Sequence, residues 1–217
     1  MLEIPLLHID TVFFPGIPVQ LFITDNQHKA LVRFCLMNKR PFGVVPFLSS
    51  DISEHESMEP DSYGCLTYIK SVEELERGCF SLSAIAQERI QIVGLRRDKG
   101  LLFGQVKLVP IRSYDVLQAE KASQRLKPWV IKFIQLQSET GGLGTGLCEM
   151  PARPLALACL AAHLLNIHSD SKRALLRCDS TSELLNALIS HYRREATIME
   201  AIAMTDSQKV ESYIWAN

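Results

Sequence analysis

The chain has 217 residues, of which 47% are hydrophobic and 22% are charged, and its formal net charge is −1 at pH 7. A chain of this length and composition can bury a core without disulfides or bound metals. The balanced charge argues against a nucleic-acid footprint and against attachment to an anionic membrane surface, because both need a clustered excess of Lys and Arg.

The first half of the chain has the pattern of short β-strands. Six apolar segments are rich in β-branched and aromatic residues and are bounded by turn residues. They cover residues 19–23, 42–47, 65–69, 80–85, 89–93 and 103–109. Asp98, Lys99 and Gly100 supply a hairpin turn, and residues 26–37 form a helix with Asp25 as its N-cap. Local hairpins of this kind predict a barrel or rolled sheet.

From about residue 113 the periodicity becomes helical. Four apolar residues share one helix face within residues 116–138, namely Leu126, Trp129, Val130 and Phe133. Pro128 lies inside this stretch and predicts a kink or break, since an interior proline costs about 3 kcal/mol. Ser180 and Glu183 have the spacing of a capping box. Further helices are therefore expected at residues 155–165, 170–177 and 180–204.

The cysteines, the N-terminus and the lengths of the apolar runs indicate the cellular compartment. The six cysteines are dispersed, form no CxxC pair and mostly have apolar neighbours, which is typical of buried thiols in a reducing compartment. They are Cys35, Cys65, Cys79, Cys148, Cys159 and Cys178. The N-terminus lacks the basic leader of a signal peptide, and the longest apolar run is shorter than the ~20 residues that span a bilayer. We therefore expect a cytoplasmic protein.

Motifs that would carry chemistry are weak. The glycine-rich segment 141–146 follows a predicted helix and has no Lys-Ser/Thr after it, so it is not a Walker A loop and predicts a helix–helix connection. Cys159 and His163 are one helical turn apart, but a metal site needs three or four ligands, and only His168 and His191 are near in sequence. No serine lies in a GxSxG elbow. The sequence predicts no cofactor, no metal and no enzyme activity.

The opening of the chain resembles a known family. Residues 5–16 read PLLHIDTVFFPG and are similar to the start of the Lon protease N-terminal domain, in which a short apolar strand precedes an N-T-V-L-F-P-G segment. Weaker similarities follow in the same order along the chain, at residues 42–45, 63–66, 89–92 and 164–176. One departure is clear. Members commonly carry Phe-Glu-Pro-Arg-Tyr after the second strand, whereas residues 22–28 here read FITDNQH.

The resemblance implies an α+β fold. A PUA-like β pseudo-barrel, antiparallel and with one inserted helix, would occupy residues 1–112, and a helical bundle would occupy residues 113–217. It also implies a stand-alone, non-catalytic module that binds polypeptide substrates and lacks the ATPase and protease domains of the full enzyme. The implied partners are unfolded or partly unfolded polypeptides, with a protease, a chaperone or a second copy as further candidates.

The candidate substrate-binding residues are apolar, and three of them belong to the opening motif. They are Phe13, Phe14, Pro15, Leu21, Phe22 and Phe47. Adjacent residues of a strand point to opposite faces, so we expect one of the first two phenylalanines to line a groove between the β and helical parts.

Two other functions stay open. RNA binding would need a basic stripe, for which the candidates are Arg89, Arg96, Arg97 and Lys99. Hydrolysis would need a convergent set of polar groups in a pocket.

Overall fold

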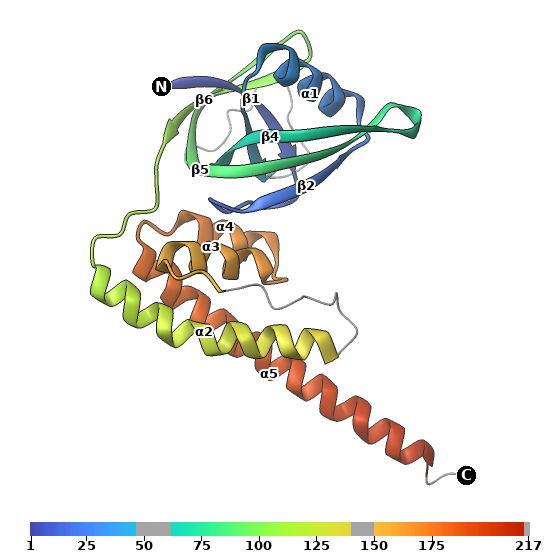
Figure 1. The fold of residues 1–217 in the computed structure, drawn as a ribbon, viewed down its shortest axis with the longest axis vertical. Coiled ribbons are helices and arrows are strands. Elements are labelled where there is room, and N and C mark those ends of the chain that lie inside the picture. Colours follow the sequence, from blue (N-terminus) through green and yellow to red (C-terminus); the bar gives the residue numbers. More distant parts are fainter. Residues whose placement is uncertain (47–61, 140–149, 215–217) are drawn as a thin grey trace. The chain divides into compact units, whose positions relative to one another are not determined.

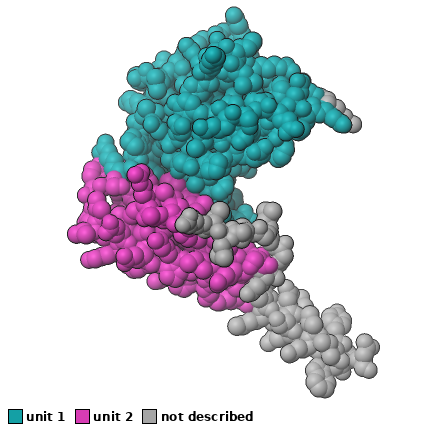
Figure 2. Space-filling model, in the orientation of Figure 1, with its two compact units in different colours: residues 1–112, 162–178 teal, residues 113–161, 179–217 magenta. Residues whose placement is uncertain are grey.

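The computed structural model describes residues 1–46, 62–139 and 150–214, with side chains in the last helix as far as Ala201 (Figure 1). The fold is mixed α+β, as the sequence predicts. The chain divides into two compact units, residues 1–112 with 162–178 and residues 113–161 with 179–217 (Figure 2). The division into 1–112 and 113–217 stays a prediction, and the compact units differ from it by grouping residues 162–178 with the β-strands.

Six strands of the described chain form one sheet. They are β1 (Leu2–Ile9), β2 (Pro18–Ile23), β3 (Phe42–Pro46), β4 (Tyr63–Leu75), β5 (Cys79–Asp98) and β6 (Leu101–Leu108). Their order is β2-β5-β4-β3-β1-β6, and β5 also pairs with β6. Five strands therefore close into a ring of pairings, with β2 attached outside it to β5. The β1–β3 pair is parallel, an exception to the antiparallel barrel that the sequence predicts, and the other pairs are antiparallel.

Strand β5 is the strand that joins the parts of this sheet. The sequence predicts separate strands at residues 80–85 and 89–93, but the structure has one strand of 20 residues. Register shifts beside Gln87 and Val93 mark β-bulges. A bulge bends a strand and increases its local twist. β5 can therefore pair with β2 at its start and with β6 at its end.

The hairpin between β5 and β6 has the predicted turn. Asp98 pairs with Leu101, so Lys99 and Gly100 form a two-residue loop. Both have positive φ, at 49° and 80°, which is the requirement of a type I′ turn. Inside the ring the core is aliphatic, and its buried members are Ile4, Leu6, Val45, Leu66, Ile90, Ile92 and Val106.

Helix α1 (Asn26–Asn38) lies against the strands on the side of β1 and β6 (Figure 1). The Asp25 carboxylate accepts hydrogen bonds from the backbone N–H groups of Gln27 and His28, at 2.8 and 3.2 Å, which confirms the predicted N-cap. The helix ends at Lys39, whose φ of 50° is left-handed. Pro41 then leads directly into β3.

The other helices are α2 (Val116–Glu139), α3 (Pro154–Leu164), α4 (Ser169–Arg177) and α5 (Thr181–Ile214), and a short 3-10 helix, η1 (Glu76–Gly78), connects β4 to β5. α2 continues through Pro128, so of the two predicted alternatives, a kink or a break, the break does not occur. A proline removes one helical hydrogen bond, and packing of α2 against α5 offsets that loss. His168 caps α4, because its imidazole accepts a hydrogen bond from the backbone N–H of Asp170. Among the described helices, none is both long enough and apolar enough to cross a membrane.

Helices α2 and α5 pack through aromatic and aliphatic side chains. The rings of Phe133 and Tyr192 meet edge to face with centroids 5.2 Å apart. The hydroxyl group of the buried Tyr192 donates to the carbonyl oxygen of Ala161 at 2.9 Å. Leu126 and Val130 are fully buried, as their spacing predicts, whereas Trp129 is half-buried. The start of α5 is a modified capping box, because Glu183 accepts from the N–H of Asp179.

Candidate functional site

The two phenylalanines of the opening motif are both buried. Phe13 is 5% exposed and Phe14 is 0% exposed. Residues 11–14 lie outside any strand, so strand alternation does not separate their side chains. The Cys65 thiol donates to the Phe13 carbonyl oxygen, and Gly16 donates to the carbonyl oxygen of Ala86. This segment is therefore packed into the β unit, and the expectation that one of the pair is exposed in a groove is wrong.

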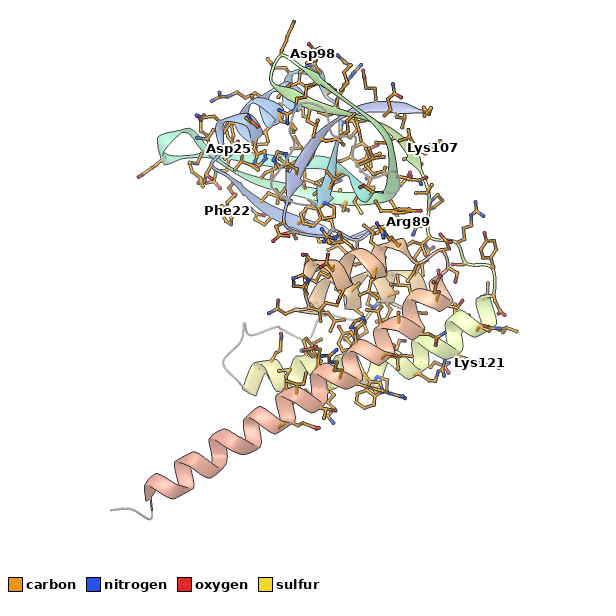
Figure 3. The ribbon with its side chains drawn as sticks, turned by 180° about the vertical axis from the view of Figure 1, so that it is seen from behind. Phe22, Asp25, Arg89, Asp98, Lys107 and Lys121 are labelled. Atoms are coloured by element: carbon orange, nitrogen blue, oxygen red, sulfur yellow. The ribbon has the colours of Figure 1, made fainter. Side chains whose placement is uncertain are left out.

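Of the other candidate residues, Phe22 is the exposed one. Its side chain is 70% exposed on β2, the outermost strand of the sheet. Figure 3 shows Phe22 projecting from the strand away from the sheet. Pro15 and Leu21 are half-buried, and Phe47 lies outside the described residues. Among the described candidates, Phe22 therefore has the most exposed side chain for contact with a partner.

The strand register places other apolar groups on the same face as Phe22. Pro18 pairs with Ile85, and Ile85 pairs with Tyr68 on its other side. Pro18 and Tyr68 are exposed, and Ile85 is half-buried. Gln20 shares this face and donates to the Ser81 hydroxyl group at 2.8 Å. We name this surface of Pro18, Gln20, Phe22, Tyr68 and Ile85 the Phe22 face.

The five residues of the Phe22 face have side chains suited to binding. Its side chains are an aromatic ring, a phenol, a proline ring, an aliphatic chain and an amide. Such groups bury apolar surface and accept or donate a few hydrogen bonds. In addition, β2 pairs only with β5 in the described chain, so its second edge is open to a partner backbone.

A second surface of the β unit lies where α1 ends beside β4. A pocket of about 520 Å³ opens there. Its lining comes from Cys35, Leu36 and residues 39–41 on one side and from residues 68–72 of β4 on the other. We name it the edge pocket. Burial raises the pKa of the Cys35 thiol to about 12, so this thiol stays protonated and unreactive near neutral pH.

The arginines proposed for an RNA-binding stripe do not form one. Arg89 is 2% exposed and donates to the carbonyl oxygens of Val109, Leu176 and Cys178, at 2.6 to 2.8 Å. Arg96 forms ion pairs with Glu3 and Asp98. The hydrogen bond from Arg96 holds the pKa of the Glu3 carboxyl below its usual range, and the same bond raises the pKa of Arg96. These two cations are therefore engaged within the protein.

The residues considered for metal binding do not assemble a site in the described part of the chain. No group of three His, Cys, Asp or Glu side chains there could hold a metal ion. Cys159 is buried, and burial with the nearby Lys172 lowers the pKa of His163. The described cysteines, all except Cys148, are free thiols. The glycine-rich segment 141–146 lies outside the described residues.

Sequence reasoning missed Pro18 and Tyr68 as surface partners of Phe22, and it missed the role of Arg89. Tyr68 shares a face with Phe22 only through the register of three strands, which no local pattern gives. Pro18 lies four residues before Phe22 on the same strand, so strand alternation was a signal for it. A signal for Arg89 was present, because it is a charged residue at the start of a buried alternating segment, and such a charge needs internal partners.

Comparison with known proteins identifies a family and relatives that this chain resembles. The family model described as the ATP-dependent protease La (LON) substrate-binding domain matches residues 3–194. A Lon protease of Anaeromyxobacter dehalogenans is 24% identical over 208 residues, which are 94% of this chain and 24% of that protein. Lon protease 2 of Myxococcus xanthus is also 24% identical over 94% of this chain and 25% of its own length. The chain thus spans about a quarter of these curated relatives.

Two solved structures share the fold. A Lon N-terminal domain protein from Xanthomonas campestris has a TM-score of 0.62 at 19% identity, covering 88% of this chain and 98% of its own. The N-terminal domain of a Mycobacterium avium complex Lon protease has a TM-score of 0.63 at 18% identity, with the same coverage.

Proposed function

Because the chain belongs to the family of the ATP-dependent protease La (LON) substrate-binding domain, we infer that it binds polypeptide segments and does not itself catalyse a reaction. The observation that carries this proposal is the Phe22 face, an exposed surface of aromatic and aliphatic groups beside an open strand edge. Such a surface recognises apolar side chains of an unfolded segment and pairs with its backbone.

The energy of such binding is modest for one segment. Burying an exposed Phe side chain contributes about 1.5 to 3 kcal/mol. Association also costs several kcal/mol of lost rigid-body freedom. A single contact at Phe22 therefore gives weak, rapidly reversible binding, which suits a module that samples unfolded clients. A protease or a chaperone that takes over the client, and a second copy of the chain, remain proposed partners.

We also propose a fold type for the two parts of the chain and a cellular location for the protein. The closed ring of strand pairings and the similarity to Lon N-terminal domains support a PUA-like pseudo-barrel for the β part, and the α2–α5 packing supports a helical bundle after it. Free, buried cysteines in the described chain support a reducing compartment, and hence the cytoplasm.

The test compares two aromatic residues that are equally exposed. Phe22 and Tyr114 are each 70% exposed, but only Phe22 lies on the β2–β5–β4 surface. Binding of a fluorescent, permanently unfolded model protein is measured by anisotropy for the wild type, Phe22→Asp and Tyr114→Asp. Circular dichroism checks that both variants stay folded. We expect about a tenfold or greater loss of affinity for Phe22→Asp and little change for Tyr114→Asp. Equal affinities of all three proteins would refute the assignment of this face.

A further inference from the structure

Strand β4 has a long edge that no strand of the described residues pairs with. β3 pairs with it only from Phe42 to Val44, opposite residues 65–67, while β4 continues to Leu75. The ladder stops for two reasons. Pro41, just before β3, has no N–H to donate. One residue earlier than Arg40, the left-handed Lys39 ends α1, so the chain before Lys39 is helical and not extended. Residues 68–75 are paired with β5 on one edge, and within the described ranges no strand pairs with their other edge.

The edge pocket lies along this unpaired stretch and is lined by cations. Lys39 and Arg40 line it from the end of α1, and Lys70 lines it from β4. All three are exposed, and the described lining includes no acidic residue. Leu36, which is 42% exposed, and the half-buried Val72 supply apolar surface between them. The pocket therefore combines a strand edge, an apolar wall and positive charge.

We propose that the edge pocket binds an extended, acidic polypeptide segment, which adds to β4 as a further strand. This proposal rests on the inferred polypeptide-binding function and assigns a second site to it. Backbone hydrogen bonds along residues 68–72, which line the pocket and precede the exposed Glu73 and Glu74, supply affinity, and alternate side chains of the added strand face the pocket. Glutamate or aspartate side chains at those positions meet Lys39, Arg40 and Lys70.

The same charges select this occupant against a second copy of the chain. An exposed strand edge invites pairing with an identical edge, and proteins block this with lysines and β-bulges. Lys70 is the extra residue of a bulge between Ile69 and Ser71. Antiparallel pairing of two copies centred on residue 70 would set Lys70 of one copy beside Lys70 of the other, and like charges opposite each other are destabilising. An acidic strand meets attraction at the same positions.

The probe is a synthetic peptide in which valine and glutamate alternate, labelled with a fluorophore. Two control peptides carry lysine in place of glutamate or N-methyl groups on alternate backbone amides. We expect saturable binding of the acidic peptide, at least about tenfold weaker binding of the lysine peptide, and loss of binding on N-methylation, because strand addition needs the amide donors. Hydrogen exchange of residues 68–75 slows when the acidic peptide is bound. Equal binding of all three peptides, or no binding, would overturn the proposal.

Charge-reversal variants locate the site. The double variant Lys39→Glu with Lys70→Glu should lower affinity for the acidic peptide about tenfold, and Lys107→Glu should not change it. Lys107, labelled in Figure 3, is an exposed lysine on β6 and is not part of the pocket lining. An equal loss for both variants would show a non-specific charge effect and refute the site.

The two proposals fail in different ways. Phe22→Asp should weaken binding of the unfolded model protein and leave the acidic peptide bound at the edge pocket. If the model protein binds through Phe22 but no acidic peptide binds, the edge pocket is refuted and the polypeptide-binding function stands. If the peptide slows exchange at residues 68–75 but the model protein does not bind, the Phe22 face is refuted and strand addition stands.

Discussion

Replacing Arg89 by methionine should strongly destabilise the β unit. Arg89 lies on β5 and joins the strands to α4, because two of its hydrogen bonds end on the carbonyl oxygens of Leu176 and Cys178. A third bond ends on Val109, and the guanidinium lies 5.1 Å from the centre of the Tyr63 ring. The carbonyls at the end of a helix have no partner within the helix, so Arg89 acts as a C-terminal cap for α4.

The magnitude follows from these contacts. A hydrogen bond to a charged group contributes about 1.5 to 3 kcal/mol, and the desolvation of a buried guanidinium offsets part of the sum. Removing one partner of a buried charged network typically costs about 3 to 5 kcal/mol. We expect Arg89→Met to lower the free energy of unfolding by an amount in this range. That is a large share of a typical unfolding free energy of about 5 to 15 kcal/mol.

Urea denaturation followed by circular dichroism measures the loss. Arg97→Met is the matched control, because Arg97 lies on the same strand and is exposed. It should change stability by no more than about 0.5 kcal/mol. Hydrogen exchange should also show that Arg89→Met reduces the protection of α4 more than that of β1. A loss below about 1 kcal/mol, with α4 protection unchanged, would refute the role assigned to Arg89.

Three further predictions concern packing, protonation and reactivity. Gly64→Ala should lower the free energy of unfolding by about 1 to 3 kcal/mol in urea titrations, since its Cβ would overlap the carbonyl oxygen of Val44. Burial lowers the pKa of His163 in the folded protein. As the pH falls, His163 is therefore protonated at a higher pH in the unfolded protein than in the folded protein. Stability should therefore be full above pH 6.5, the ordinary histidine pKa, and fall as pH drops below it. His163→Gln should flatten this decline, and an unchanged pH profile would contradict the argument. Alkylation followed by mass spectrometry should label the half-buried Cys79 before Cys35, and the reverse order would contradict the raised pKa of Cys35.

Local chemistry in the sequence predicts the elements whose cause is local. Asp25 precedes an amphipathic stretch and caps α1, as expected of an aspartate in that position. Lys99 and Gly100 form the two-residue turn that their composition indicates. The buried stripe of α2 likewise follows from its helical spacing, except at Trp129. In each case the residues that determine the structure lie within a few positions of one another.

Features that depend on distant partners were not predictable from local pattern. The parallel pairing of β1 with β3 and the single long β5 are set by which strands meet, and β5 bends at bulges beside Gln87 and Val93. Continuity of α2 through Pro128 depends on packing against α5.

The candidate site shows the same limit. Phe14 and Phe22 are both apolar residues next to strands, and composition does not distinguish them. Phe14 lies in an irregular segment packed into the β unit, whereas Phe22 lies on the outermost strand with a face left open. The difference in exposure, 0% against 70%, arises because the segment of Phe14 packs against distant strands while β2 is the last strand in the sheet order of the described chain.

Photo-crosslinking from the surface itself tests most directly whether the Phe22 face holds polypeptide clients. A photo-reactive benzoylphenylalanine replaces Phe22 in one protein and Tyr114 in another, and each is irradiated with the unfolded model protein. The proposed function predicts crosslinks to the client from position 22, competed by unlabelled client, and background crosslinking from position 114. Equal crosslinking from both positions, or none from position 22, would contradict it.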